Sequence, residues 1–205
     1  MLRPEYPIRT PRLTLRPYRA DDFDALYDIQ SRPEVTRYLL FGARNRDEVR
    51  KSLRQRVAAT ELDDEGGSLV LAVVLPETGA VIGDVVLFWR SREHRLGEIG
   101  YIFHPDHGGQ GYATEAAQVM LRLGFDELGL HRIIGRVDAR NTASAPLSLR
   151  VAGVRRGTAS AMVEVSVPHT TGSSPAGKIR LTDRRLVGMR TARWNHGPHR
   201  PSSTT

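Results

Sequence analysis

The chain has 205 residues, no cysteine and a formal net charge of +7 at pH 7. This length allows one domain with a full-sized core, and the lack of cysteine excludes disulfides and thiolate-bound metals. No apolar run reaches the roughly 18 residues of a membrane-spanning helix, and the start MLRPEYPIRT lacks the apolar stretch of a secretion signal, so we expect a soluble cytoplasmic protein.

The positive charge is confined to one end of the chain. Residues 1–145 contain 20 Lys and Arg and 21 Asp and Glu, whereas residues 146–205 contain 10 Lys and Arg and two acidic residues. A basic tail can bind polyanions without sequence preference, but most such tails are solvated, so the pattern does not favour nucleic-acid binding. We therefore divide the chain into a domain, 1–145, and an atypical basic segment, 146–205, which is rich in Gly, Pro, Ser, Thr and Arg and expected to be largely disordered.

The first third of the chain predicts a strand and two helices. Residues 12–19 alternate apolar and polar side chains, as a half-buried strand does. Residues 20–30 place apolar side chains at helical spacing after Asp21 and Asp22, either of which can cap the helix. Residues 45–60 predict a second amphipathic helix with an Arg-rich outer face. Its expected core-facing residues stand four apart: Val49, Leu53 and Val57.

The middle of the chain predicts three strands, a helix and a further strand. The three strands lie at residues 68–75, 80–89 and 96–105, and the turn between the first two reads Pro-Glu-Thr-Gly. Residues 113–127 carry apolar side chains at helical spacing, and 131–137 is a short β-rich run. The order β-α-α-β-β-β-α-β indicates a mixed α/β (α+β) fold rather than a regular doubly wound sheet.

A glycine-rich stretch, HPDHGGQGYATEA from His104 to Ala116, joins the third of these strands to the helix. Backbone N–H groups at a helix start have no intrahelical partner, and with the helix dipole they can bind a phosphate or pyrophosphate. Glycines let a bulky anion approach these groups. A turn that only joins strand to helix is an equally good interpretation of the local composition. The residues that would supply the N–H groups are Gly109, Gln110, Gly111, Tyr112, Ala113 and Thr114.

The residues around this loop resemble a known family. The stretches GEIGYIFHPDHGGQGYATEA and LGFDELGLHRIIGRVDARNTAS are similar to the GCN5-related N-acetyltransferase (GNAT) superfamily. Together with the opening TPRLTLRPYRADDFDALYDIQSRPEVTRYL, they most resemble the branch that acetylates ribosomal-protein N-termini and related amines. The family's phosphate loop has the form Arg/Gln-x-x-Gly-x-Gly/Ala. Residues 111–113 fit its second half, whereas Gly108 stands where Arg, Gln or Trp is usual.

The resemblance implies a fold and a chemistry. The fold is a mostly antiparallel sheet flanked by helices, with the cofactor strand splayed from its neighbour so that backbone groups around Phe103 receive the pantetheine arm. Acetyl-CoA is the implied co-substrate, and no metal is expected. The acceptor is a primary amine, on a protein N-terminus or a small molecule, that attacks directly in a ternary complex. No membrane partner is expected, and a homodimer is one allowed assembly.

Three side chains are candidates for roles in that chemistry. Glu98 is within about 7 Å of Gly100, beside which the thioester is expected, and several family members carry the general base at the matching position. The alternative is a solvated carboxylate at the strand end. Asn141 matches a residue that hydrogen-bonds cofactor or substrate, although it could also cap a helix. Ser144 is a weaker candidate of the same kind. The histidines do not show metal-ligand spacing: His104, His107 and His131.

The resemblance ends near residue 145. The family continues into a helix and two strands that complete the sheet and often supply a tyrosine as general acid, whereas residues 146–205 contain no tyrosine. Residues 162–167 alternate as one further strand at best, and without it the strand at 131–137 becomes an exposed sheet edge. An active N-acetyltransferase is therefore our first interpretation. A CoA-binding protein with impaired activity is the second, and a basic-tailed nucleic-acid-binding protein is the third.

Overall fold

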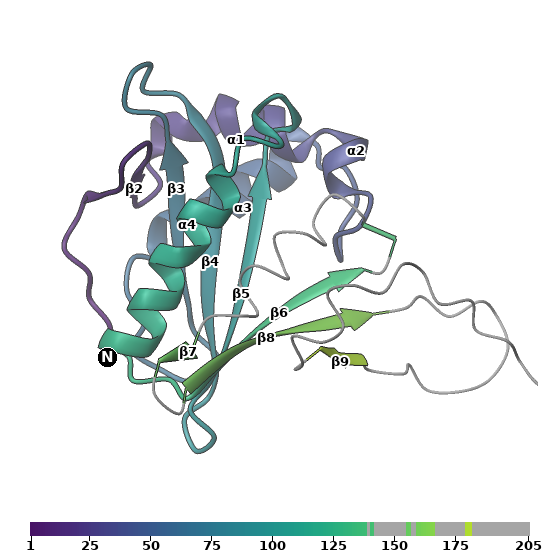
Figure 1. Cartoon of the computed structure of the whole chain (residues 1–205). Helices are drawn as coiled ribbons and strands as arrows, with labels where there is room; N and C mark the ends of the chain where they lie inside the picture. The colour runs from purple at the N-terminus through teal and green to yellow at the C-terminus, as the bar shows by residue number, and fades with distance from the viewer. Residues whose placement is uncertain (139, 142–154, 157–158, 167–178, 182–205) are drawn as a thin grey trace, which may run out of the picture.

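One mixed sheet forms the centre of the protein in a computed structural model that describes residues 1–138, 140–141, 155–156, 159–166 and 179–181 (Figure 1). Its strands are β1 (Ile8–Arg9), β2 (Thr14–Arg16), β3 (Ser68–Val74), β4 (Val81–Ser91), β5 (Leu96–Phe103), β6 (Arg132–Asp138), β7 (Arg155–Arg156), β8 (Ala159–Ser166) and β9 (Ile179–Leu181). They lie in the order β1-β2-β3-β4-β5-β6-β8-β7, and β9 pairs with β8. Only the pairs β5–β6 and β6–β8 are parallel. The expected mixed, mostly antiparallel sheet is confirmed.

Helices cover both faces of this sheet. The helices are α1 (Phe23–Gln30), α2 (Pro33–Thr36), α3 (Arg46–Ala58) and α4 (Tyr112–Arg122). Figure 1 shows α4 in front of the sheet, with α1 and α3 behind it. The predicted helix at 113–127 is thus α4 together with a π-helical turn that follows it, Leu123–Glu127. No helix of the described residues is long and apolar enough to span a membrane.

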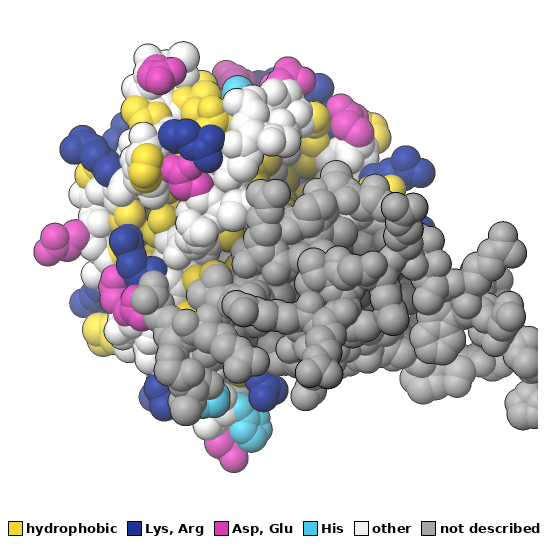
Figure 2. Space-filling view, in the orientation of Figure 1, with side chains coloured by type: hydrophobic (Ala, Val, Ile, Leu, Met, Phe, Trp, Pro, Cys, Tyr) yellow, Lys and Arg dark blue, Asp and Glu magenta, His cyan; other side chains and the backbone are white. Residues whose placement is uncertain are grey.

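The described surface is mixed in charge and mostly polar. Figure 2 shows basic and acidic side chains interspersed over one face of the molecule. One core residue predicted from the sequence belongs to this surface, because Val57, near the end of α3, is 39% exposed. Val49 and Leu53 are buried as expected. The four-residue spacing drifts around the 3.6-residue helix, so the third member of the series no longer faces the sheet.

The strand β3 is apolar from Leu69 to Val74 because both of its faces are buried. Leu69, Leu71 and Val73 belong to the larger core cluster, which α4 covers. Val70 and Ala72 point the other way, into the smaller cluster with α1 and α3. A strand between two helical layers reads as a continuous apolar run rather than an alternating one, as residues 68–75 do.

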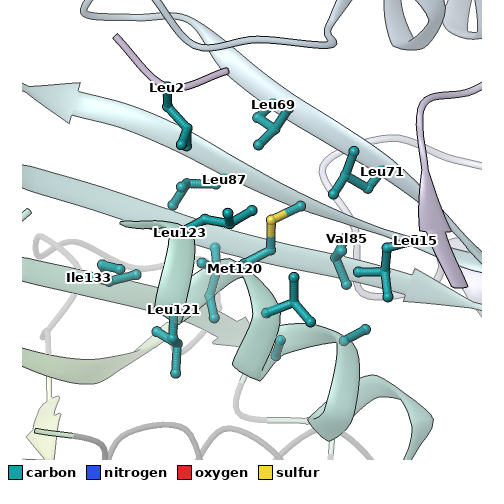
Figure 3. Packing of buried hydrophobic residues seen from close by; sticks show 14 of the residues in the cluster. Leu2, Leu15, Leu69, Leu71, Val85, Leu87, Met120, Leu121, Leu123 and Ile133 are labelled. Carbon is teal, nitrogen blue, oxygen red and sulfur yellow. The ribbon is translucent and has the colours of Figure 1, made fainter. Parts of the chain in front are cut away.

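The helix α4 and its π-helical turn pack closely on the sheet. Figure 3 shows Met120 of α4 among side chains of the central strands, with Leu123 of the turn beside Leu87. Gly124 allows this close contact, because a Cβ atom there would lie 2.6 Å from Cδ1 of Ile133 and would force that side chain to shift. The face of the sheet that carries the start of α4 is therefore rigid and densely packed.

The start of α1 is fixed by a nearly buried ion pair. Asp22 is the N-cap residue of α1, but its side chain does not bond the helix N–H groups. It accepts two hydrogen bonds from the guanidinium of Arg16, at 2.7 and 2.8 Å, and one from the backbone N–H of Arg19 at 2.7 Å. Asp22 thus ties α1 to β2, which is a tertiary role rather than the local cap expected from the sequence.

The C-terminal segment contributes more strands than the sequence predicted. We expected at most one strand, at 162–167, and the structure has β8 there, parallel to β6 from Arg132↔Ser160 to Asp138↔Ser166. Two further strands, β7 and β9, flank β8, so the expectation of a single strand was wrong. The strand β6 is therefore paired along both edges and is not the exposed edge that a missing C-terminus would leave. The expected disorder of the rest of 146–205 lies outside the described residues.

The Asp22–Arg16 pair predicts an acid-sensitive contribution to stability. Burial raises the pKa of Asp22, but the bonds from Arg16 and Arg19 lower it more, so it lies below the ordinary value of 3.8. A carboxyl group whose pKa is lowered by folding stabilises the protein above its unfolded pKa, and this stabilisation is lost as the pH falls through the folded value. We expect Asp22→Asn to lower the free energy of unfolding by about 3 kcal/mol at pH 7.

Urea unfolding at a series of pH values measures this loss. The difference between wild type and Asp22→Asn should shrink below pH 3.8. The control is Asp47→Asn, because Asp47 pairs with Arg50 on the exposed face of α3 and should contribute only about 0–1 kcal/mol. Equal losses in the two variants, or a pH-independent loss in Asp22→Asn, would contradict the assignment.

Candidate active site

The central strands β5 and β6 part halfway along their length. They pair from Leu96↔Arg132 to Ile99↔Gly135, and there the pairing ends. The strand β5 continues to Phe103, still paired with β4, while β6 turns away toward Asp138 (Figure 1). Among the described strands, the part of β5 beyond Ile99 therefore pairs only with β4. The other edge offers N–H and C=O groups to a ligand.

Two cavities lie along this part of β5. The first, which we call the loop cavity, has a volume of about 420 Å³ and extends to the glycine-rich loop and the start of α4. The second, the strand cavity, has a volume of about 410 Å³ and lies between the end of the paired segment, α3 and the residues after α2. Four residues line both cavities: Leu39, Tyr101, Ile102 and Asn141. A ligand in one cavity can therefore contact a ligand in the other.

The glycine-rich loop presents unpaired backbone donors beside the loop cavity. Gly108 N–H donates to Pro105 at 2.8 Å, and Glu115 N–H donates to Gly111 at 3.1 Å. No hydrogen bond among the described residues uses the six N–H groups between them, from Gly109 to Thr114. All of these predicted residues except Gln110 line the cavity.

The conformation of the loop explains its glycines. Gly109 and Gly111 have φ values of +74° and +81°, where residues with a Cβ atom are strained. A Cβ atom on Gly109 would meet nothing within 4 Å, so the space beside it is open to a ligand. Gly111 is also the N-cap residue of α4. These residues fit an anionic group such as a pyrophosphate at the helix start.

An arginine that the sequence analysis did not identify holds the loop in place. The Arg12 guanidinium, from the link between β1 and β2, donates to the carbonyl of Gln110 at 2.8 Å and to the Glu115 carboxylate at 2.7 Å. It also lies 4.9 Å from the centre of the Tyr112 ring. Burial raises the pKa of Glu115, but bonds from Thr10 and Arg12 lower it more, so Glu115 is ionised. Arg12 offsets that negative charge where an anion would bind, a role that Gly108 cannot fill.

Glu98 lies near the parting strands but is already paired. It is 9% exposed and accepts a hydrogen bond from Nε of Arg90 at 2.8 Å, and Nη2 of Arg136 is 3.6 Å away. It does not line either cavity, whereas Gly100, two residues later, lines the strand cavity. It is therefore not the freely solvated carboxylate of the alternative interpretation. Its role as a base stays a prediction.

The strand cavity is lined by a carboxylate that the sequence analysis did not identify. Asp84, in the middle of β4, is 3% exposed and lines the cavity. Tyr18 and Arg56 donate hydrogen bonds to its Oδ2 atom at 3.1 and 2.9 Å. The signal was a charged residue within the apolar run AVIGDVVLFW, since a carboxylate in a central strand is expensive to bury without partners.

The remaining predicted residues lie as follows. Phe103 ends β5 and lines the loop cavity. Asn141 lines both cavities, and its N–H donates to the carbonyl of Asp138 at 2.9 Å. Ser144 lies outside the described residues. His104 and His107 line the loop cavity, whereas His131 lies on the surface before β6.

Comparisons with known proteins agree on one family. Residues 12–152 match the family model described as Acetyltransferase (GNAT) domain. The protein called uncharacterized N-acetyltransferase YnaD, from Bacillus subtilis (strain 168), is 31% identical over 73% of this chain and 82% of its own length. The crystal structure of a GNAT-family acetyltransferase from Bacillus anthracis superimposes with a TM-score of 0.63, at 30% identity, over 73% of this chain and 84% of that one. The spermidine N-acetyltransferase of Vibrio cholerae, solved with CoA and spermine, shares the fold with a TM-score of 0.59, at 23% identity, over 72% of this chain and 84% of that one.

The phosphate loop generates a test of CoA binding. We expect Gly111→Val to weaken CoA at least tenfold, about 1.4 kcal/mol, because a branched side chain would obstruct the N–H groups at the start of α4. The matched control is Gly79→Val in the β3–β4 turn, where φ is also positive at +71° and no ligand is expected. Calorimetric titration of CoA into both folded variants measures the effect. Equal CoA affinities in the two variants would remove the loop from the binding site.

Proposed function

Because this chain belongs to the GNAT acetyltransferase family and is an acyl-CoA-dependent N-acetyltransferase, we propose that it acetylates a primary amine by direct attack on acetyl-CoA. The acceptor is a protein N-terminus or a small-molecule amine. The observation that carries the proposal is that the loop cavity and the strand cavity meet along the edge of β5 that the sheet leaves unpaired. The narrower assignment to the branch that acetylates ribosomal proteins stays a prediction.

The cofactor would bind in the loop cavity. The N–H groups from Gly109 to Thr114 and the dipole of α4 favour the pyrophosphate there. From the loop, the pantetheine arm would follow β5 back toward Gly100. At about 3.3 Å per residue, a few residues of strand bring the thioester to the point where the two cavities meet. Along this path the arm would run beside Tyr101, Ile102 and Asn141, which line the loop cavity.

Acetyl-CoA supplies an activated acetyl group. The amine nitrogen bonds to the acetyl carbon, the carbon–sulfur bond breaks, the amine gives up its proton, and the sulfur leaves as the CoA thiol. The residues of this chain would hold the reactants together and take the proton, and each of these contributes to the rate. Glu98 is the proposed base and would take the proton through a bridging water molecule. The hydrogen bond from Arg90 holds its carboxylate near Gly100.

Turnover of acetyl-CoA tests the role of Glu98. We expect Glu98→Gln to lower turnover by roughly 10²–10⁴-fold and to change acetyl-CoA affinity little, because the amide cannot accept the proton. Release of CoA thiol, followed across peptides with varied N-termini and small amines, measures it. Glu93→Gln is the matched control, because Glu93 lies exposed in the β4–β5 turn.

Two results would contradict this proposal in different ways. Wild-type turnover in folded Glu98→Gln would return Glu98 to a structural role. Thermal stabilisation of the wild-type protein by CoA, without thiol release for any amine, would instead support a cofactor-binding protein with impaired activity.

A further inference from the structure

The strand cavity has largely apolar walls, and Asp84 is the only polar side chain that β4 contributes to its described lining. The aromatic and aliphatic residues that line it are Tyr38, Leu39, Phe41, Ala59, Val70, Val86, Phe88, Ile99, Tyr101 and Ile102. On the β4 side, the only acidic residue among the described lining residues is Asp84. Because a buried carboxylate needs hydrogen-bond partners, the partners that Asp84 has and lacks indicate what the cavity can bind.

Two neighbouring side chains hold Asp84 as a hydrogen-bond acceptor. Burial raises the pKa of Tyr18 well above its ordinary value, so the hydroxyl stays a neutral donor. Burial lowers the pKa of Arg56, but the attractions of and hydrogen bonds with Asp84 and Tyr18 together raise it more, so the guanidinium stays charged. Arg56 is itself held by Ser52, whose hydroxyl accepts from Nη1 at 2.6 Å. These partners fix the carboxylate in one orientation.

One oxygen of Asp84 is left for a ligand. The bonds from Tyr18 and Arg56 both end on Oδ2. The described polar side-chain atoms that are sealed from solvent and lack a partner are Gln30 Nε2, Asp63 Oδ1, Trp89 Nε1 and His104 Nε2. Asp84 Oδ1 is not one of them, although it accepts no hydrogen bond from the described residues. It is therefore reachable from the cavity.

The remaining charges of the wall are neutralised. Asp138 accepts hydrogen bonds from the Arg140 guanidinium at 2.7 and 3.0 Å, and Arg136 lies 3.6 Å from Glu98. With Asp84 paired to Arg56, each described carboxylate of the wall has a guanidinium partner. A polyamine carries several ammonium groups, each of which would need its own unpaired carboxylate on burial. The cavity is therefore poorly suited to a polyamine.

We propose that the strand cavity selects a primary amine carried on an aromatic or aliphatic body, and that Asp84 Oδ1 accepts a hydrogen bond from its nitrogen. The inference rests on the proposed function and names its acceptor class. Asp84 lies opposite Ile102 and diagonally across from Gly100, a separation of about 7–8 Å, so a nitrogen between them reaches both the carboxylate and the expected thioester.

A panel of acceptors tests this selection. We expect kcat/KM to be at least tenfold higher for 2-phenylethylamine, or for a peptide that starts with Phe, than for spermidine. Comparison of 2-phenylethylamine with the peptide that starts with Phe distinguishes a small-molecule acceptor from a protein N-terminus. A preference for spermidine would overturn the inference and leave the acetyltransferase function intact. Absence of acetyl-CoA binding would overturn the function, and calorimetric titration of the same amines into the protein would still decide the preference of the cavity.

Variants of the cavity wall test the apolar contact with the body of the amine, and variants of Asp84 test the hydrogen bond to its nitrogen. Phe41→Ala should lower kcat/KM for 2-phenylethylamine about tenfold and leave methylamine unaffected. Leu40→Ala is the matched control, since Leu40 is the neighbouring residue but is fully exposed and does not line the cavity. Equal effects of Phe41→Ala on both amines would contradict an apolar contact.

Asp84→Asn should lower kcat/KM for both amines at least tenfold through KM, with acetyl-CoA affinity unchanged. An unchanged KM in a folded Asp84→Asn protein would overturn the role of the carboxylate. Since this variant also leaves the buried charge of Arg56 unpaired, it can fail to fold. Tyr18→Phe then replaces it: the Arg56–Asp84 pair remains, but the carboxylate loses one of the two bonds that orient it, so KM for both amines should rise. An unchanged KM in Tyr18→Phe would count against the proposal.

Discussion

The parting of β5 and β6 after Ile99 and Gly135 is the feature on which the rest of the site depends. Two parallel strands that separate leave backbone polar groups without partners, which is costly unless a ligand or solvent takes them. The sheet tolerates the separation because each strand is held on its other edge, β5 by β4 and β6 by β8. The glycines at the parting point, Gly100 and Gly135, keep side chains out of the space that opens there.

The two faces of the sheet supply different chemistry to this space. On one face, the rigid packing of α4 and its π-helical turn fixes the start of the helix beside the end of β5. On the other face, α3 and the residues after α2 enclose a cavity with largely apolar walls, in which Asp84 is held by Tyr18 and Arg56. A cofactor with an anionic end and an amine acceptor can therefore approach the same few residues of β5 from opposite sides.

Three carboxylates in or near the site are each paired with an arginine. Arg12 neutralises Glu115 beside the phosphate loop, Arg56 neutralises Asp84 in the strand cavity, and Arg90 holds Glu98. Each pair joins elements far apart in the sequence or on neighbouring strands. Such pairs contribute more to the position of a group than to net stability, because desolvation offsets much of the attraction. These pairs orient the hydrogen-bond donors and acceptors of the site, and they leave little net charge there.

The sequence by itself determined the order of the elements, the family and the position of the glycine-rich loop, because these depend on local periodicity, on glycines and on short motifs. It also indicated one strand beyond residue 145, the present β8. Only the tertiary structure decided the rest. Arg12 and Asp84 reach the site from β-strand regions about 100 and 20 residues from the loop, and no local pattern links them to it. Val57 is exposed because the 3.6-residue helix turn, and not a four-residue spacing alone, sets which face is buried. Asp22 binds Arg16 instead of capping its own helix because the folded sheet places that guanidinium beside it.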